Sequence, residues 1–210
     1  MKQKDLINSL RSTRLVPIFD PIEQNATISI IEQLIDAGSK HAEITFRSAT
    51  AIETFKQARS NFPKLILGAG SILTPDQYLL ARELGADFTI SPGFDIELHQ
   101  ATCSDTVHIP GAMTASELIQ INKLGLKIVK FFPAVPAGGA KTLHDLARIF
   151  SDTLFMPSGG ILEKDLLEFS KISNVLSVGG SWIFRGDKID KFSIRENFKR
   201  SVSIMNHGFE

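Results

Sequence analysis

The sequence contains a single cysteine, Cys103, among its 210 residues. One thiol cannot form an internal disulfide, nor can it supply a cysteine-based zinc site. The five histidines lack the spacing of metal-binding motifs, so we expect no metal. An excess of charge is missing as well, because 23 Lys and Arg residues balance 23 Asp and Glu residues. A chain without a global basic field is not expected to bind nucleic acid.

Long apolar runs are also missing. No run approaches the roughly 18–20 residues that cross a membrane. Residues 1–6 lack the continuous apolar stretch of a secretory signal. We therefore expect a cytoplasmic protein with no membrane partner. With 43% hydrophobic and 22% charged residues, the composition is that of a globular protein, and the length favours one domain over residues 1–210.

A repeated unit runs through the whole chain, in which a short apolar run precedes a helical pattern. The eight apolar runs lie at residues 15–19, 41–46, 65–70, 87–91, 107–109, 127–132, 153–156 and 175–178. Strands that alternate with helices predict a parallel sheet. Eight units predict a closed (β/α)8 TIM barrel with an extra N-terminal helix at residues 1–11, and a doubly wound open sheet is the alternative.

Polar residues alternate along the second predicted strand. Side chains of a strand point to opposite faces in turn, so Glu43 and Arg47 share a face with His41 and Thr45. The intervening apolar residues should face the helices, which directs the polar set into the barrel. Burying a carboxylate or a guanidinium group costs desolvation free energy, so such groups are usually paired with an opposite charge or take part in function. This strand therefore predicts a functional site.

Lys130 occupies the inward face of the sixth predicted strand, in its C-terminal half. Barrel enzymes place their chemistry at that end of the strands. Burial disfavours the charged form of a lysine, and a neutral amine can attack a carbonyl to form a Schiff base. A lysine that reaches solvent, or one that only pairs with Glu43, fits the pattern equally well.

Three glycine-rich segments follow predicted strands. The segments 158–160 (Ser-Gly-Gly) and 179–181 (Gly-Gly-Ser) follow the seventh and eighth strands, where barrels often bind phosphate. Two ordinary turns are the alternative explanation. The segment 68–71 (Gly-Ala-Gly-Ser) lacks a third glycine at the dinucleotide-binding position. We interpret it as a close approach of the backbone near a ligand.

Short motifs in a consistent order carry a family resemblance over nearly the whole chain. They are Glu43-Ile44-Thr45-Phe46-Arg47, Gly68-Ala69-Gly70-Ser71, Ile90-Ser91-Pro92-Gly93, Ile109-Pro110-Gly111, Lys130-Phe131-Phe132-Pro133-Ala134, Pro157-Ser158-Gly159-Gly160-Ile161 and Val178-Gly179-Gly180-Ser181-Trp182. The sequence resembles the bacterial 2-keto-3-deoxy-6-phosphogluconate (KDPG) aldolases, which often also cleave 4-hydroxy-2-oxoglutarate. The resemblance implies a (β/α)8 barrel, a homotrimer, a role in the Entner-Doudoroff pathway and class I chemistry without a cofactor.

The resemblance also assigns roles to individual residues of this chain. It implies that Lys130 forms the Schiff base and that Glu43 is the general acid and base. The residues implied at the pyruvate end are Arg47, which would hold the carboxylate, with Ser71, Pro92 and Phe132. The residues implied at the phosphate end are Ser158, Gly159, Gly160, Gly180 and Ser181.

One loop departs from the family pattern. After Phe132-Pro133-Ala134 the family commonly continues Glu-Ala-Asn, whereas this chain has Val135-Pro136-Ala137. The sequence thus predicts an aldolase acting on a small 2-oxo acid, with the preference between the two substrates left open. Two alternatives remain: another phosphate-binding barrel lyase or isomerase that uses no Schiff base, and a non-catalytic barrel that binds a sugar phosphate.

Overall fold

The structure is a computed structural model that describes residues 2–20, 23–102, 105–184 and 191–207. Strands and helices alternate along the chain, as the spacing of apolar runs predicts. The strands are β1 (Leu15–Phe19), β2 (His41–Thr45), β3 (Ile66–Gly70), β4 (Phe88–Ile90), β5 (Val107–Ile109), β6 (Gly111–Ala112), β7 (Ile128–Phe131), β8 (Leu154–Pro157) and β9 (Val178–Gly180). The α-helices are α1 (Gln3–Thr13), α2 (Gln24–Asp36), α3 (Ala49–Asn61), α4 (Pro75–Glu83), α5 (Ile96–Ala101), α6 (Ala115–Lys123), α7 (Gly139–Ile149), α8 (Leu166–Ser170) and α9 (Lys191–His207).

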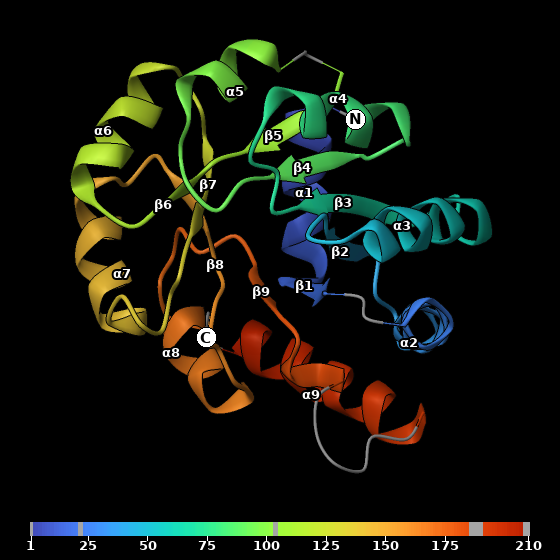
Figure 1. The fold of residues 1–210 in the computed structure, drawn as a ribbon. Helices are drawn as coiled ribbons and strands as arrows, with labels where there is room; N and C mark the ends of the chain where they lie inside the picture. The colour runs from blue at the N-terminus through green and yellow to red at the C-terminus, as the bar shows by residue number, and fades with distance from the viewer. Residues whose placement is uncertain (1, 21–22, 103–104, 185–190, 208–210) are drawn as a thin grey trace.

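The strands form a closed ring with the helices outside it (Figure 1). One sheet has the order β5-β4-β3-β2-β1-β9 and a second has the order β6-β7-β8, and all pairs are parallel. Parallel bridges from Phe155 to Val175 and from Ser158 to Gly179 join β8 to the β9 segment. Only Pro110 separates β5 from β6, so these two form one interrupted strand. The predicted (β/α)8 barrel with a leading helix is confirmed.

The helix starts follow from capping chemistry in the sequence. Thr74 precedes α4 and its hydroxyl accepts a hydrogen bond from the backbone N–H of Gln77, with Pro75 at the first helical position. Thr114 and Glu117 form a complete capping box at the start of α6. Each cap satisfies N–H groups that a helix leaves without a partner. In the described part of the chain, no helix combines the length and the apolar character that crossing a bilayer would need.

The eighth predicted strand is misplaced. We predict it at residues 175–178, but β9 spans Val178–Gly180, and Val175 contributes only a single bridge. The backbone N–H of Val175 donates to the carbonyl of Ile172, and the Asn174 amide donates to three carbonyl groups. Residues 172–175 are thereby held in a turn. The strand that follows ends in two glycines, which have low strand propensity and therefore gave no strand signal.

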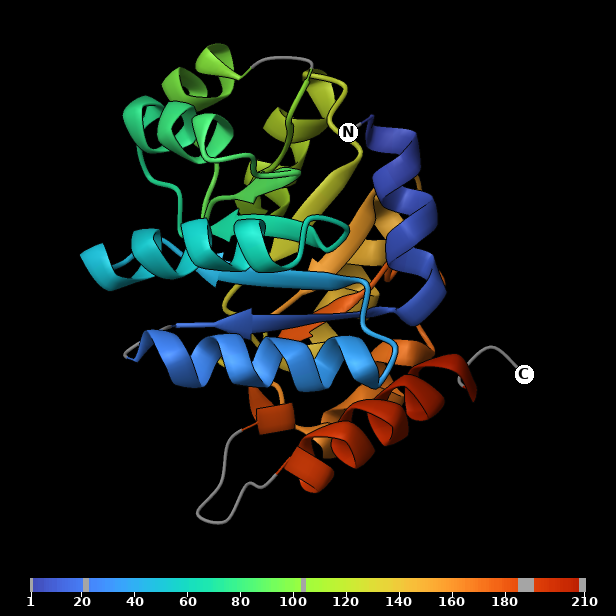
Figure 2. The same ribbon diagram turned by 90° about the vertical axis from the view of Figure 1, so that its right-hand side faces the viewer.

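The interior of the barrel is apolar at its amino-terminal end. Figure 2 shows α1 lying across that end. Leu6 and Leu10 of α1 are fully buried and pack on inward-facing residues of the strands. Those strand residues are Val16, Phe88, Ile90, Ile109, Ile128 and Met156, and Leu176 just before β9 joins them. Because α1 seals this end with side chains, a ligand can enter only at the carboxyl end.

We predict that Leu10→Ala lowers the free energy of unfolding by about 2–5 kcal/mol, since it leaves a cavity between α1 and the apolar interior of the barrel. Arg11→Ala, on the exposed face of the same helix, serves as the matched control and should change stability by less than about 0.5 kcal/mol. Denaturant unfolding followed by circular dichroism measures both. Equal effects of the two variants would show that α1 is not packed into the barrel.

Candidate active site

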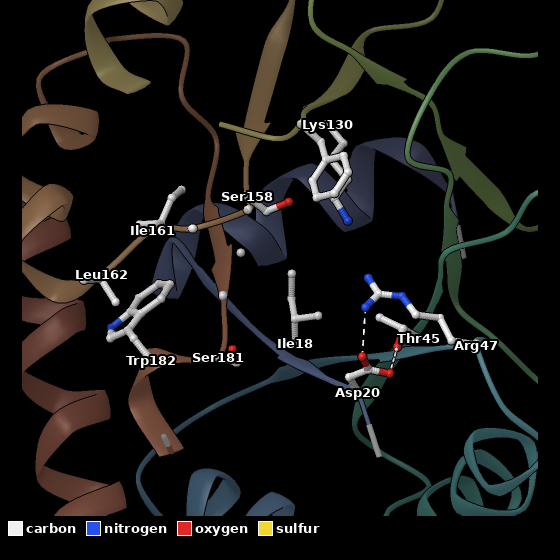
Figure 3. A pocket seen from close by; sticks show the side chains of 15 residues that line it. Ile18, Asp20, Thr45, Arg47, Lys130, Ser158, Ile161, Leu162, Ser181 and Trp182 are labelled. Atoms are coloured by element: carbon white, nitrogen blue, oxygen red, sulfur yellow. Dashed lines mark hydrogen bonds and ion pairs between the residues drawn. The ribbon is translucent and has the colours of Figure 1, made fainter. Parts of the chain in front are cut away.

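A cavity of about 460 Å³ opens at the carboxyl end of the barrel (Figure 3). The carboxyl ends of β1, β2, β7, β8 and β9 contribute its walls. Its lining consists of Ile18, Asp20, Thr45, Arg47, Lys130, Phe132, Ser158, Gly159, Gly160, Ile161, Leu162, Gly179, Gly180, Ser181 and Trp182. Strands that are distant in sequence therefore meet at one site, as the parallel topology requires.

Lys130 and Glu43 form an ion pair inside the barrel. The distance from Lys130 Nζ to Glu43 Oε1 is 3.3 Å, and the side chains are 9% and 1% exposed. Phe132 packs beside the amine, with its ring centroid 5.2 Å from Nζ. The structure therefore directs both residues inward, as the alternation along their strands predicts. An amine buried against one carboxylate has a proton acceptor within reach and little competing water.

Gly70 makes room for the Glu43 side chain. A Cβ atom built on Gly70 would lie 2.9 Å from Glu43 Cγ and would collide with Glu43 Oε1. A Cβ atom on Gly68 would likewise collide with the ring of Phe88. The close backbone approach predicted for this glycine segment therefore exists. It accommodates the side chains of Glu43 and Phe88.

Arg47 lies at the edge of the cavity with two hydrogen-bond partners. Its Nη1 donates to Asp20 Oδ2 at 2.8 Å, and its Nε donates to Ser71 Oγ at 3.1 Å. Asp20 in turn accepts a hydrogen bond from Thr45 Oγ1 at 3.0 Å. Figure 3 shows the guanidinium group pointing into the cavity from the same side as Asp20. This end of the site is therefore suited to a carboxylate, which a guanidinium group binds in a planar geometry.

The glycine loops form the opposite wall. Gly159 and Gly160 have φ values of 99° and 78°, which suit residues without a side chain. Ser158 is 3% exposed, and its Oγ has no hydrogen-bond partner among the described residues. A buried hydroxyl that faces a cavity without a partner is available to a ligand. This wall carries no charged side chain, so it offers backbone N–H groups and hydroxyl groups to an anion.

The loop that departs from the family pattern supports this glycine wall. The N–H of Ala134 donates to the carbonyl of Ser158 at 2.7 Å, and the N–H of Val135 donates to that of Gly159 at 3.0 Å. A Cβ atom on Gly160 would lie 3.1 Å from Val135 Cβ. Ala134 and Val135 therefore contact the glycine wall from outside the cavity and hydrogen-bond to its backbone.

Not every predicted residue lines the cavity. Pro92 lies outside the lining, and its carbonyl instead packs against Gly111. Ser71 reaches the site only through its hydrogen bond to Arg47. The sequence analysis missed Asp20. An acidic residue that directly follows the first strand, with the same parity as Val16 and Ile18, was the signal for it.

Two buried histidines belong to the packing of the barrel wall. Burial lowers the pKa of His41 to about 4, with a smaller contribution from Lys40, and the ring is hydrogen-bonded to Ser9 Oγ at 2.8 Å. Burial also lowers the pKa of His108 to about 4, and its ring contacts Thr89 Oγ1 at 2.9 Å. Both rings are neutral at pH 7, as packing residues should be. Within the described ranges, no three potential metal ligands lie together.

Comparison with known proteins agrees with this geometry. The profile of the family described as "Aldolase: KDPG and KHG aldolase" matches residues 6–199. The chain belongs to this family. It is 34% identical to the KHG/KDPG aldolase of Escherichia coli over 177 residues. The match covers 84% of this chain and 83% of that relative. The protein is therefore an aldolase, which is an aldehyde-lyase.

Solved structures of aldolases share the fold. The KDPG aldolase of Zymomonas mobilis, solved with 3-phosphoglycerate, has a TM-score of 0.89 and 28% identity, covering 96% of each chain. The KDPG aldolase of Legionella pneumophila has a TM-score of 0.81 and 31% identity, covering 95% of each chain. The latter structure holds pyruvate captured as a covalent carbinolamine intermediate.

We predict that Gly70→Ala lowers kcat of the aldolase by about 10²-fold or more, because the new methyl group displaces Glu43 from Lys130. Gly93→Ala is the matched control, since a Cβ atom there meets nothing within 4 Å, and its kcat should stay within about twofold of the parent. Pyruvate release measures kcat, and circular dichroism verifies folding. A folded Gly70→Ala enzyme with parental kcat would contradict the placement of Glu43.

Proposed function

We propose that this aldolase cleaves KDPG to pyruvate and glyceraldehyde 3-phosphate, KHG (4-hydroxy-2-oxoglutarate) to pyruvate and glyoxylate, or both, through a Schiff base on Lys130. The observation that carries the proposal is the buried pair of Lys130 and Glu43. Lys130 lines the cavity, and Glu43 lies outside the lining with its Oε1 3.3 Å from Lys130 Nζ. A Schiff base needs a neutral amine and a nearby group that moves protons, and Glu43 is placed to take the ammonium proton of Lys130.

The reaction begins at the C2 ketone. Glu43 accepts a proton from the Lys130 ammonium group, and the neutral amine attacks C2. The resulting carbinolamine takes that proton back from Glu43 and loses water to give an iminium, which leaves Glu43 ionised again. Glu43 accepts the proton of the C4 hydroxyl group, directly or through a water molecule. The C3–C4 bond then breaks, its electron pair moves toward the iminium nitrogen, and the aldehyde leaves. The remaining enamine gains a proton at C3, and water hydrolyses the iminium to release pyruvate.

Each end of the cavity binds one end of the substrate. Arg47 binds the carboxylate beside the ketone, with Ser71 bonded to its Nε and Phe132 beside the amine. Pro92 supports this end from outside the lining. The distal phosphate of KDPG, or the second carboxylate of KHG, meets the neutral wall of Ser158, Gly159, Gly160, Gly180 and Ser181.

We also propose the assembly and location of the enzyme. Family membership supports a single barrel domain over residues 1–210 that functions as a cytoplasmic homotrimer. It also supports catalysis without a metal or organic cofactor, since the covalent bond to Lys130 supplies the electron sink. Light scattering coupled to gel filtration measures the number of subunits, and a monomeric mass would reject the trimer.

We predict that borohydride with pyruvate reduces an adduct onto Lys130, which peptide mapping locates. The physical reason is that the iminium carries the positive charge that hydride attacks. The adduct should inactivate the enzyme in proportion to its yield. An adduct confined to other lysines would reject the assignment.

Three variants serve as controls for this experiment. Lys130→Arg should abolish the adduct, whereas Lys127→Arg, at an exposed position just before the same strand, should retain it. Glu43→Gln should retain the adduct and lower kcat by about 10²–10⁴-fold, since it removes proton transfer but leaves the amine. A Glu43→Gln enzyme that turns over at the parental rate would remove Glu43 from the mechanism.

We predict that Gly160→Ala lowers kcat/KM for KDPG by about tenfold, because a φ of 78° strains alanine and its Cβ would press on Val135. The half-saturating concentration of pyruvate in the trapping assay should change less than about twofold, because pyruvate has no distal group. Pyruvate release from KDPG and KHG, measured side by side, also gives the preferred substrate. A fall in kcat/KM for KDPG matched by an equal rise in the half-saturating pyruvate concentration would contradict a distal phosphate site.

A further inference from the structure

Asp20 is a charged residue of the cavity that the proposed reaction does not use. It follows β1 directly and has the inward parity of Val16 and Ile18, so its side chain reaches the cavity lining. Its carboxylate lies beside the Arg47 guanidinium and across the cavity from the glycine wall (Figure 3). A carboxylate in a site that binds anionic substrates is unfavourable unless it performs another task.

The contacts of Asp20 indicate that task. Its Oδ1 accepts the hydrogen bond from Thr45 Oγ1, and its Oδ2 accepts the one from Arg47 Nη1. Thr45 belongs to β2 and is 1% exposed, so it is a fixed point of the barrel. The carboxylate therefore connects a buried strand residue to an exposed guanidinium group.

Arg47 needs such a connection. It lies beyond the end of β2, and its side chain is 54% exposed. A long exposed side chain loses rotamer freedom when a ligand fixes it, which weakens binding unless the protein orders it beforehand. Asp20 holds Nη1 and Ser71 holds Nε, so the guanidinium is fixed from two sides. In the described part of the chain no acceptor is bonded to Nη2, which remains for the ligand.

We propose that Asp20 is a positioning residue, which orients Arg47 for the carboxylate of the 2-oxo acid. The inference rests on the proposed function, since it takes that carboxylate as the ligand of Arg47. Repulsion between Asp20 and the ligand opposes this effect, but solvent reaches Asp20 and screens the repulsion. Solvent also weakens the charge attraction between Asp20 and Arg47, but the hydrogen bonds of Asp20 to Arg47 Nη1 and Thr45 Oγ1 are directional and keep the guanidinium group oriented.

The test measures pyruvate capture by the full-length enzyme. Asp20→Ala should raise the half-saturating pyruvate concentration in borohydride trapping about tenfold, and it should raise KM while kcat stays within about threefold. Asp20→Asn, which retains one acceptor oxygen, should give an intermediate increase. Thr45→Val, which removes the anchoring hydroxyl group, should shift the same concentration in the same direction.

A double-mutant cycle separates positioning from a general structural effect. In an Arg47→Ala background, Asp20→Ala should have no further effect on pyruvate capture, because it acts through Arg47. An unchanged or lowered half-saturating concentration in Asp20→Ala would overturn the inference. An increase that persists in the Arg47→Ala background would overturn it as well.

The outcome also distinguishes this inference from the proposed function. A parent enzyme that forms no adduct on Lys130 would reject the Schiff base, and calorimetric titration with pyruvate would then test Asp20 alone. Weaker pyruvate binding by Asp20→Ala, dependent on Arg47, would support the inference even so. Binding equal to that of the parent, or no pyruvate binding by the parent, would reject it.

Discussion

The ion pair of Lys130 and Glu43 constrains the structure around it, because two charges sit where almost no water reaches. Removing either partner of a buried pair leaves an uncompensated charge, at a cost of roughly 3–5 kcal/mol. Several features keep the pair intact. Gly70 has no side chain where Glu43 needs space, and the apolar floor sealed by α1 keeps solvent away from below. The resulting amine is enclosed on all sides except the cavity.

The cavity has two ends with different electrostatics. Arg47 and Asp20 form a charged end in which the cation is already oriented, whereas the glycine wall offers an uncharged end built from backbone and hydroxyl groups. A backbone site binds an anion through many weak donors, so it tolerates a phosphate or a carboxylate alike. This tolerance is consistent with a family whose members act on both KDPG and KHG. The loop around Val135, which hydrogen-bonds to the backbone of the glycine wall, is where this chain can differ from its relatives.

Local rules predicted most of the barrel and the residues at its centre. Alternation along β2 and β7 directed Glu43 and Lys130 inward, because strand geometry is fixed by the backbone. The same rules failed where contacts between distant segments decide the structure. Asn174 holds a turn that delays the last strand, and Pro92 packs against Gly111 outside the cavity. Sequence patterns carry no information on such contacts, since their partners are far apart in the chain.

The sequence by itself determined the alternation of strands and helices, the helix caps and the inward direction of Glu43 and Lys130 along their strands. These properties depend on neighbours a few residues away, where backbone geometry allows few choices. Only the tertiary structure decided which inward residues meet. The closing of the barrel brings Lys130 to Glu43 across 87 positions of sequence, whereas the parallel pairing of β1 with β2 brings Asp20 to Arg47 across 27. Strand register and tilt set both distances, and no single strand specifies them.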